Sequence, residues 1–571
     1  MLIKMSPVKL AQRFCSTLVP VLALLSVSVS LPMADPPMVP GRPFMFMWNA
    51  PTELCEVRYD IDLDLSYFDL ESSTLKSATN QSISLFYTDR FGVFPYVNED
   101  TGEMHEDGLP QFIDMAEHRE EAEDDIEYYI PTDQPGLAVL DFEEWRPQWN
   151  RNWGDKDIYR DISVDMVKFK NPTMSDDMAE DRAKIVFERA AKKYFVKSIN
   201  IGKRLRPNRR WGYYLYPDCY NYDFNQGLED FTGECPDIEK DRNDELLWLW
   251  KESTALYPSI YLELMLRDTQ QARWFVRHRM QEAMRVSALA NSSHAIPVYP
   301  YIRPVYKDSV DNYMSEYDLV NTIGEAASLG AAGVVAWGDM DLTDTEESCI
   351  DADNHLDQVM NPYILNVSMA TKMCSKALCQ GQGRCVRKNW NEDVYLHLDP
   401  RRYRIQRDVP GGPLTVNGRL SQDDIRFYDQ NFDCMCYSPE PCRSVLSLSA
   451  ITEPVTNTSQ DGNKQRLRKK IAVAKKAFEE AVTEYNAVVG EAEKLPLPND
   501  FLTENNDYRQ SECHGDMAQK KEFYFNVMEL TSLKEEAVVL IREFKQYWEQ
   551  MKNMTKVTKE LFSQLSQGLP G

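Results

Sequence analysis

Between residues 43 and 348, short apolar runs alternate with longer amphipathic segments. The apolar runs predict strands at Phe44–Trp48, Ile83–Tyr87, Leu137–Phe142, Trp211–Tyr216, Val298–Ile302 and Gly333–Trp337. The amphipathic segments predict helices that include Met178–Leu205, Gln271–Leu289 and Glu316–Leu329. Repeated strand–helix alternation favours a parallel α/β barrel. The alternative is an open doubly wound sheet, which is disfavoured because no glycine-rich phosphate turn follows the first strand.

The last part of the chain, residues 465–571, has a helical pattern with steps of four and three residues. One run comprises Leu467, Ile471, Ala474, Phe478, Ala481, Tyr485 and Val488, and a second comprises Leu533, Ala537, Leu540, Phe544, Tyr547, Met551 and Met554. These runs predict two amphipathic helices in a coiled-coil-like tail after a linker at 447–464, and self-association through them is an expectation. Neither run is apolar enough for a transmembrane anchor, and no lipid-anchor signal follows them.

The first 34 residues have the layout of a secretory signal peptide. Basic residues precede an apolar run from Leu18 to Val29, and small residues follow at Ser30 and Ala34. An uncleaved anchor helix is the alternative, but the run is short for a bilayer and contains Pro20. We therefore expect cleavage between Ser30 and Ala34 and entry into the secretory pathway, with an extracellular or lysosomal destination.

Export places the cysteines in an oxidising compartment. Cleavage removes Cys15 and leaves eleven of the 12 cysteines, so most should pair and Cys513 is the expected leftover. Six of them lie between Cys374 and Cys442 with the spacing C-x4-C-x5-C followed by C-x-C-x5-C. Their spacing alone does not determine the pairing, and a zinc site is disfavoured because no histidine pair lies nearby. Acceptor sequons for N-glycosylation occur at Asn80, Asn291 and Asn366, and also at Asn457 and Asn553.

The charge balance narrows the class of partner. The chain carries 64 Lys and Arg against 90 Asp and Glu, a net charge of −26, which argues against nucleic acid or an anionic membrane surface as partner. A hydrophobic share of 43% is sufficient for a packed core and excludes general disorder. No motif indicates a cofactor or a metal, and we expect neither.

The segment with the clearest chemical signal is Gly136-Leu-Ala-Val-Leu-Asp141-Phe-Glu143. Positions i and i+2 of a strand face the same side, so Asp141 and Glu143 should point into one space. At the carboxyl end of a barrel strand that space is the active site. Two close carboxyl groups cannot both ionise freely, and a protonated acid beside a carboxylate suits glycosidic bond cleavage. The alternative is a solvated acidic pair, which the apolar strand and the flanking Trp145, Trp149 and Trp153 disfavour.

Aromatic residues also cluster at later predicted strand ends. They lie in Trp211–Tyr220, in Tyr257–Tyr261 and at Trp337. Sugar rings stack on aromatic faces, and tyrosine hydroxyls can orient polar groups of a substrate. The alternative is that these side chains belong to the barrel core and have satisfied hydroxyls.

Several segments together resemble the animal hyaluronidases, glycoside hydrolase family 56. The matching segments are Arg42–Thr52, Ile83–Tyr87, Asp141–Arg160, Trp211–Phe224, Asp244–Tyr261, Gly324–Trp337 and Lys372–Trp390. The resemblance covers roughly residues 40 to 445. It implies a distorted (β/α) TIM-type barrel at 35–370 and a small disulfide-rich EGF-like module at 371–446. The tail from 465 resembles nothing in the family.

The resemblance also implies an activity, which is internal cleavage of the β-1,4 bonds between N-acetylglucosamine and glucuronate in hyaluronan. Glu143 would be the general acid and base, and Asp141 would polarise the substrate's acetamido group. That acetamido oxygen would attack the anomeric carbon with retention, so the D-x-E pair is not a nucleophile and an acid. The residues matching substrate-binding positions are Tyr87, Tyr214, Asp218, Tyr257, Ser259, Tyr261 and Trp337.

Family pairing implies five disulfides. They are Cys55–Cys349, Cys219–Cys235, Cys374–Cys385, Cys379–Cys434 and Cys436–Cys442. A polyanionic substrate would also require local cations in an acidic protein. Arg279 and Arg303 are candidates, and the basic stretch from Lys203 to Arg210 is either part of the groove or a solvated loop.

Two other functions remain as alternatives. A chondroitin-preferring hydrolase would use the same residues. A non-catalytic hyaluronan-binding or adhesion protein would be expected to have lost the acid, and Glu143 is present.

Overall fold

The structure is a computed structural model that describes residues 31–98, 101–407 and 412–446. Residues 1–30 of the predicted signal peptide, the predicted linker and tail, and Cys513 lie outside the described residues. Strand β1 (Met33–Ala34) pairs with β9 (His294–Ala295), so the folded chain begins at or before Met33. No described helix is both long enough and apolar enough to cross a membrane.

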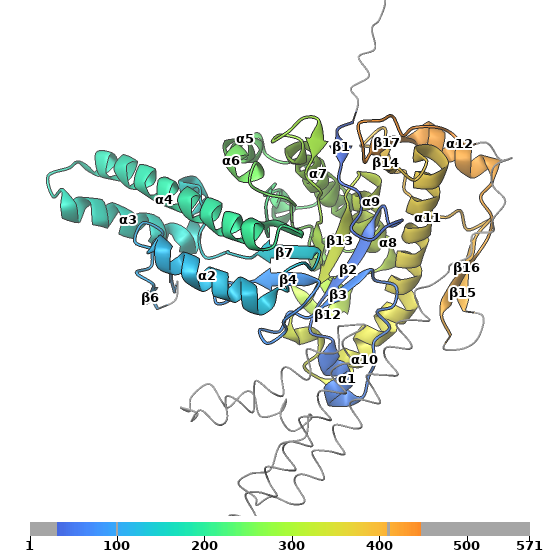
Figure 1. Ribbon diagram of the computed structural model, residues 1–571, viewed down its shortest axis with the longest axis horizontal. Coiled ribbons are helices and arrows are strands. Elements are labelled where there is room, and N and C mark those ends of the chain that lie inside the picture. Colours follow the sequence, from blue (N-terminus) through green and yellow to red (C-terminus); the bar gives the residue numbers. More distant parts are fainter. Residues whose placement is uncertain (1–30, 99–100, 408–411, 447–571) are drawn as a thin grey trace, which may run out of the picture. The chain divides into compact units, whose positions relative to one another are not determined.

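Parallel strands form the centre of the fold (Figure 1). One sheet has the order β10 (Tyr301–Ile302), β13 (Gly333–Trp337), β2 (Met45–Asn49) and β3 (Leu70–Ser72), and another has the order β4 (Ile83–Phe86), β7 (Gly136–Leu140) and β8 (Arg209–Tyr213). Residues 256–259 join β8 to β10 through the parallel bridges Tyr214–Tyr257 and Ser259–Tyr301. On the other side, the Ile83 N–H donates to Ser72 Oγ at 2.9 Å. The segments therefore form a closed parallel ring and not an open sheet.

The alternation of side chains along these strands builds the barrel interior. Its buried cluster includes Met45, Met47, Ile83, Leu85, Leu137, Val139, Tyr257, Tyr299 and Tyr301. All five residues of β7 are buried, because helices cover the outer face of the strand. Burying one large apolar side chain contributes about 1.5–3 kcal/mol. At Gly212 in β8, a Cβ would lie 2.2 Å from the Ala255 carbonyl oxygen, so only glycine fits there.

Prolines explain where the predicted strands were too long. The segment predicted at Val298–Ile302 is a strand only at Tyr301–Ile302, since Pro297 and Pro300 have no N–H to donate to a neighbour. Residues 256–259 contain Pro258 and form only isolated bridges for the same reason. Strand β3 was not predicted, because Leu70-Glu-Ser is short and polar.

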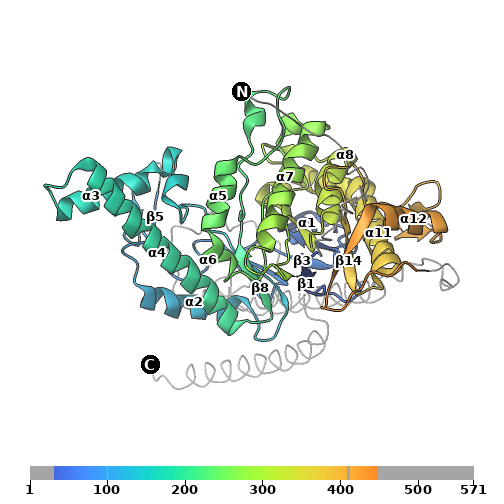
Figure 2. The same ribbon diagram turned by 90° about the horizontal axis from the view of Figure 1, so that it is seen from above.

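Helices surround the ring (Figures 1 and 2). Helix α2 (Met115–Tyr129) begins at Asp114, whose side chain accepts from the Ala116 N–H at 2.8 Å. It packs on α4 (Asp176–Leu205), which itself pairs with α3 (Asp157–Lys170). Helix α7 (Gln270–Ser287) begins at Thr269, which caps the Ala272 N–H at 3.1 Å. The helix predicted at 316–329 is divided into α8 (Glu316–Leu319), a π-helical turn (Val320–Gly324) and α9 (Glu325–Ser328).

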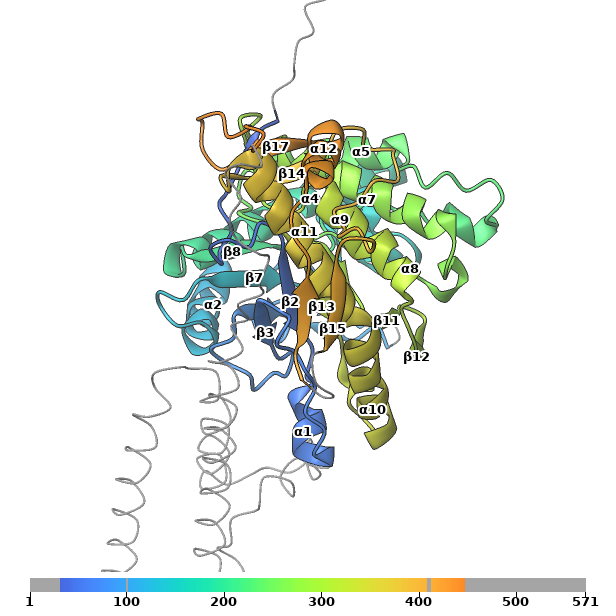
Figure 3. The same cartoon turned by 90° about the vertical axis from the view of Figure 1, so that its right-hand side faces the viewer.

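The cysteine-rich part of the chain follows two helices, α10 (Glu346–His355) and α11 (Asn361–Cys379) (Figure 3). It contains β14 (Gly383–Arg387) paired with β17 (Phe432–Cys436), β15 (Arg404–Arg407) paired with β16 (Leu414–Asn417), and α12 (Gln422–Asn431). Helix α11 runs through residue 370, so the barrel and the cysteine-rich region share one helix.

The described residues contain five disulfides, and they are the five pairs that the family resemblance implies. They are Cys55–Cys349, Cys219–Cys235, Cys374–Cys385, Cys379–Cys434 and Cys436–Cys442. The first ties α1 (Glu53–Tyr59) to α10 across 294 residues of sequence. Three others hold α11, β14, β17 and the segment that follows β17 together.

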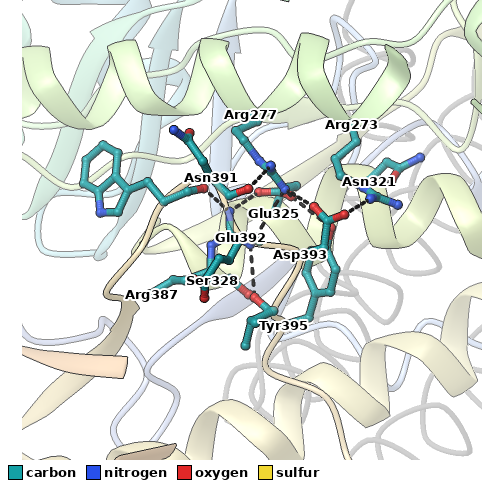
Figure 4. Close-up of polar contacts among 12 residues, drawn as sticks. Arg273, Arg277, Asn321, Glu325, Ser328, Arg387, Asn391, Glu392, Asp393 and Tyr395 are labelled. Carbon is teal, nitrogen blue, oxygen red and sulfur yellow. Dashed lines mark hydrogen bonds and ion pairs between the residues drawn. The ribbon is translucent and has the colours of Figure 1, made fainter. Parts of the chain in front are cut away.

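A buried ionic junction attaches the cysteine-rich region to the barrel helices (Figure 4). Glu325 of α9 is fully buried, and its Oε1 accepts from Arg277 Nη2 at 2.5 Å and from the Tyr395 hydroxyl at 2.9 Å. Its Oε2 accepts from Arg387 Nη2 at 2.6 Å. Arg277 belongs to α7 and also pairs with Asp393 at 2.7 Å, while Arg387 belongs to β14. Four separate segments therefore meet around one carboxylate.

Candidate active site

Asp141 and Glu143 lie directly beyond the carboxyl end of β7. The Asp141 N–H donates to the Phe86 carbonyl at 2.8 Å, which extends the β4–β7 pairing by one residue. Asp141 therefore follows Leu137 and Val139 on the inward face, as the alternation predicts. Phe142 between the two acids points the other way and packs on Phe94 and Tyr213. The Glu143 side chain is 52% exposed and so is open to a substrate.

Asp141 has a strongly perturbed pKa. Burial raises the pKa of Asp141 well above its ordinary value, and the negative charges of Glu143 and Glu144 raise it further, while Arg146 acts in the opposite direction. Its Oδ1 is buried and has no hydrogen-bond partner among the described residues. Burial and the neighbouring acids therefore make the Asp141 carboxylate more basic than a solvated one, beside an exposed carboxyl group.

Aromatic side chains from four further strand ends surround this pair. Trp337 ends β13, and its indole N–H donates to the Tyr87 hydroxyl at 3.2 Å. The Tyr261 ring stacks near Trp337, with centroids 6.2 Å apart, and the Tyr214 ring lies 6.2 Å from Tyr261. The structure thus brings Tyr87, Tyr214, Tyr261 and Trp337 together around Asp141.

These tyrosines remain protonated. Burial raises the pKa of Tyr214, and the charges of Glu143 and Asp141 add to the shift. Burial also raises the pKa of Tyr87, again with a contribution from Asp141. Because the Tyr214 hydroxyl shares hydrogen bonds with Ser259 and Tyr261, its direction is held by its neighbours. The tyrosine hydroxyls can therefore act as oriented hydrogen-bond donors.

The other expected substrate-binding residues have different positions. Tyr257 is fully buried in the barrel core, and its hydroxyl donates to the Arg210 carbonyl at 2.5 Å, so the structure does not bring it to the site. Asp218 is buried and pairs with Arg151 at 3.3 Å and Arg279 at 3.6 Å. Burial alone would raise the pKa of Asp218, but these two arginines lower it. Asp218 is therefore ionised and engaged within the protein, while Ser259 lies beside Tyr214.

The positions of the candidate cations also differ from one another. Arg279 is buried on α7, where it donates to Asn221 Oδ1 at 2.8 Å and to the Ser259 carbonyl at 3.0 Å, so its guanidinium supports the site from behind. The basic stretch from Lys203 to Arg210 leads into the amino end of β8, opposite to Asp141. Its members pair with protein groups, such as Lys203 with Glu252 at 2.9 Å and Arg210 with Asp35 at 2.7 Å. That stretch does not line the site.

Glu144 is a third carboxyl group, which the sequence reasoning missed. It is partly buried, one carboxyl oxygen has no partner among the described residues, and the other accepts from Thr88 Oγ1 at 3.3 Å. Burial raises the pKa of Glu144. The doubled acid Glu143-Glu144 was the available signal, but a pattern of alternate positions assigns the second glutamate to the outer face.

The arrangement can protonate a leaving oxygen and stabilise a developing positive charge. Glu143 is accessible, Asp141 is a buried proton acceptor, and three tyrosines and a tryptophan enclose the space between them. In the described part of the chain, no group of three or more His, Cys, Asp or Glu side chains is placed to bind a metal ion.

Comparisons with known proteins show which family the chain is similar to. The hyaluronidase family of glycoside hydrolases (family 56) matches residues 33–445. Mouse hyaluronidase-5 is 44% identical over 77% of this chain and 83% of its own length, and human hyaluronidase PH-20 is 44% identical over 74% and 82%. Bee venom hyaluronidase in complex with a hyaluronic acid tetramer has a TM-score of 0.50 and 28% identity, over 56% of this chain and 98% of its own.

Proposed function

The chain belongs to the hyaluronidase family, and from this premise we propose that it is an endo-acting glycoside hydrolase that cleaves hyaluronan. The observation that carries the proposal is the buried Asp141, with one unpaired oxygen, beside the exposed Glu143 at the carboxyl end of the parallel ring. Curated relatives more than 40% identical over most of the chain are named hyaluronidases, and a solved relative holds a hyaluronic acid tetramer.

In the proposed reaction, the bond cleaved is the β-1,4 bond between N-acetylglucosamine and glucuronate. Glu143 donates its proton to the bridging oxygen as the bond to the anomeric carbon breaks. The substrate's acetamido oxygen attacks that carbon from the opposite face, and positive charge develops on the acetamido group. Water then attacks the anomeric carbon and gives a proton to Glu143, which yields net retention of configuration.

Asp141 and the tyrosines assist the acetamido group. A raised pKa makes Asp141 a good acceptor for the acetamido N–H proton as that group becomes positive. The Tyr214 hydroxyl, protonated and held by Ser259 and Tyr261, orients the acetamido oxygen. Tyr87 and Trp337 form the wall of the pocket and keep water from the reacting face.

The test is release of reducing ends from hyaluronan by wild type, Glu143→Gln and the matched control Glu144→Gln. Removal of a general acid should reduce kcat about 10²–10⁴-fold in Glu143→Gln, while Glu144→Gln should retain most activity. Even-numbered products should appear, and proton NMR should show the β-anomer first. Hyaluronan binding without release would overturn the proposal in favour of an adhesion protein, and faster release from chondroitin would reassign the substrate.

We also propose that the protein is exported and that residues 371–446 form an EGF-like module. The five disulfides and the N-terminal leader pattern support export. Asn291 is exposed, which suits glycan attachment, whereas the other two predicted acceptors, Asn80 and Asn366, are partly buried. A mass decrease after glycosidase treatment of secreted protein would support export.

Light scattering with and without residues 465–571 tests self-association through the tail.

A further inference from the structure

Hyaluronan carries one carboxylate per disaccharide, and the mouth of the site is rich in acids. Asp141, Glu143, Glu144, Asp339 and Asp341 all lie at this end of the barrel. An anionic sugar bound there requires a cation with free hydrogen-bonding capacity. The arginines near the site can be compared by the partners that they already have.

Two of these arginines are occupied by protein partners. Arg146 donates to the Glu143 carbonyl at 2.6 Å and pairs with the Glu143 carboxylate at 3.5 Å. Arg90 donates to the Thr74 carbonyl at 2.9 Å, lies near Asp89 and covers the Tyr87 ring. Both are therefore fixed by groups of the protein, as is Arg279 behind the site.

Arg303 differs from them. It continues the inward alternation of Tyr299 and Tyr301 one residue past the end of β10, one layer above the apolar core. Its guanidinium lies 5.0 Å from the centre of the Trp337 ring, and its Nη2 donates to Asp339 Oδ2 at 3.0 Å. Asp339 is 35% exposed, so water can replace Arg303 as its partner. Arg303 Nε is buried without a hydrogen-bond partner among the described residues, as are Arg90 Nε and Arg279 Nη2, so what distinguishes Arg303 is that its hydrogen-bond partner is a partly exposed carboxylate that water can solvate.

We propose that Arg303 binds the glucuronate carboxylate of the sugar chain next to the cleaved residue, with Asp339 as the protein group that it exchanges for this carboxylate. The proposal rests on the proposed function. The guanidinium is planar, carries five donors and stacks on Trp337, so it is positioned for a bidentate contact at low conformational cost. Arg303 thus contributes to substrate specificity, since a neutral polymer cannot replace its bond to Asp339.

The test is a cycle that changes the enzyme and the substrate separately. KM and kcat are measured for wild type and Arg303→Gln on hyaluronan and on its carboxyl methyl ester. Loss of a charge-assisted hydrogen bond should raise KM of Arg303→Gln on hyaluronan about tenfold or more, with a small change in kcat. On the methyl ester, wild type and variant should have the same KM. Arg204→Gln, which removes the same charge at the other end of the barrel, is the matched control and should not change KM.

Two outcomes overturn the proposal. In one, Arg303→Gln loses the same factor on both substrates, or loses kcat alone, which would mean that Arg303 only supports Trp337. In the other, Arg204→Gln weakens binding as much as Arg303→Gln. If wild type releases no reducing ends, the proposed function fails, and the same cycle is read from Kd values for defined oligosaccharides and their esters.

Discussion

Two buried carboxyl groups of this protein have opposite environments. Glu325 is fully buried, yet each of its oxygens accepts from an arginine and one also accepts from Tyr395. Asp141 is buried with an unpaired oxygen and has acids as neighbours. Burial alone therefore does not indicate function. A buried carboxylate with complete partners joins parts of the fold, whereas a buried carboxyl group without them has a shifted pKa and is available for chemistry.

The largest effect is expected at the junction. Glu325→Ala should lower the free energy of unfolding by about 3–5 kcal/mol, because Arg277 and Arg387 would be left buried without their shared partner. Urea denaturation measures this change. Glu180→Ala, an exposed glutamate of α4, is the control and should change stability by less than about 0.5 kcal/mol. Equal stability of Glu325→Ala and wild type would mean that the junction does not hold the two regions together.

At the site the same kind of substitution should act on activity and not on stability. Asp141→Asn should lower kcat on the order of a hundredfold or more, since the amide cannot accept the acetamido proton. The pKa of Asp141 is higher in the folded protein than in the unfolded chain, so its ionisation at rising pH lowers the free energy of unfolding. The amide of Asp141→Asn does not ionise, so this variant should be as stable as wild type or more stable. Reducing-end assays and thermal unfolding test both parts. A destabilised Asp141→Asn variant would contradict the contrast with Glu325.

A smaller, pH-dependent effect concerns a histidine near the junction. His397 accepts from or donates to the Tyr363 hydroxyl at 2.8 Å and stacks on Tyr395, and burial lowers the pKa of His397 to about 4. The pKa of His397 in the folded protein therefore lies below its pKa in the unfolded chain. As pH falls from about 6.5 towards 4, the unfolded chain takes up a proton that the folded protein does not, so the free energy of unfolding decreases; above about pH 6.5 this loss is absent. The decrease is roughly 1.4 kcal/mol per pH unit for one histidine.

Replacement of this histidine isolates its contribution. His397→Gln should make the pH dependence of stability between about pH 6.5 and 4 shallower by one proton. Burial also lowers the pKa values of His118 and His355 to about 4, so the remaining slope should still be positive. Urea denaturation at several pH values measures it, and an unchanged slope in His397→Gln would show that this side chain is protonated in the folded protein.

The comparison also shows how far sequence reasoning reaches. Asp141 and Glu143 could be found because a strand has a period of two and the active site of a barrel lies at a known end. Tyr257 is a tyrosine of the same predicted segment as Tyr261, but it lies deeper in the barrel and belongs to the core. The depth of a side chain depends on the stagger of neighbouring strands, which has no local signal.

The basic side chains that could bind an anionic substrate were the hardest residues to identify from the sequence. The sequence left the stretch from Lys203 to Arg210 as either part of the groove or a solvated loop, and the structure places it at the amino end of β8, away from the site. Arg279 lies within α7 and Arg303 follows β10, and each has one buried nitrogen without a partner among the described residues. They differ in their partners, because Arg279 contacts Asp218, Asn221 and Ser259, whereas Arg303 donates to Asp339. A charge is available to a ligand only if its protein partners can be replaced, and those partners come from distant segments.

The sequence by itself determined the parallel α/β class, the acidic pair at the end of one strand and, through family likeness, the disulfide pairs and the membership in the hyaluronidase family. These features depend on local periodicity and on residue identity. Only the tertiary structure decided which buried charges are satisfied. It brought Arg277 and Arg387 to the two oxygens of Glu325, and it left one oxygen of Asp141 unpaired and Arg303 with Asp339 as its hydrogen-bond partner, because hydrogen bonds between residues far apart in the chain exist only once the barrel has closed.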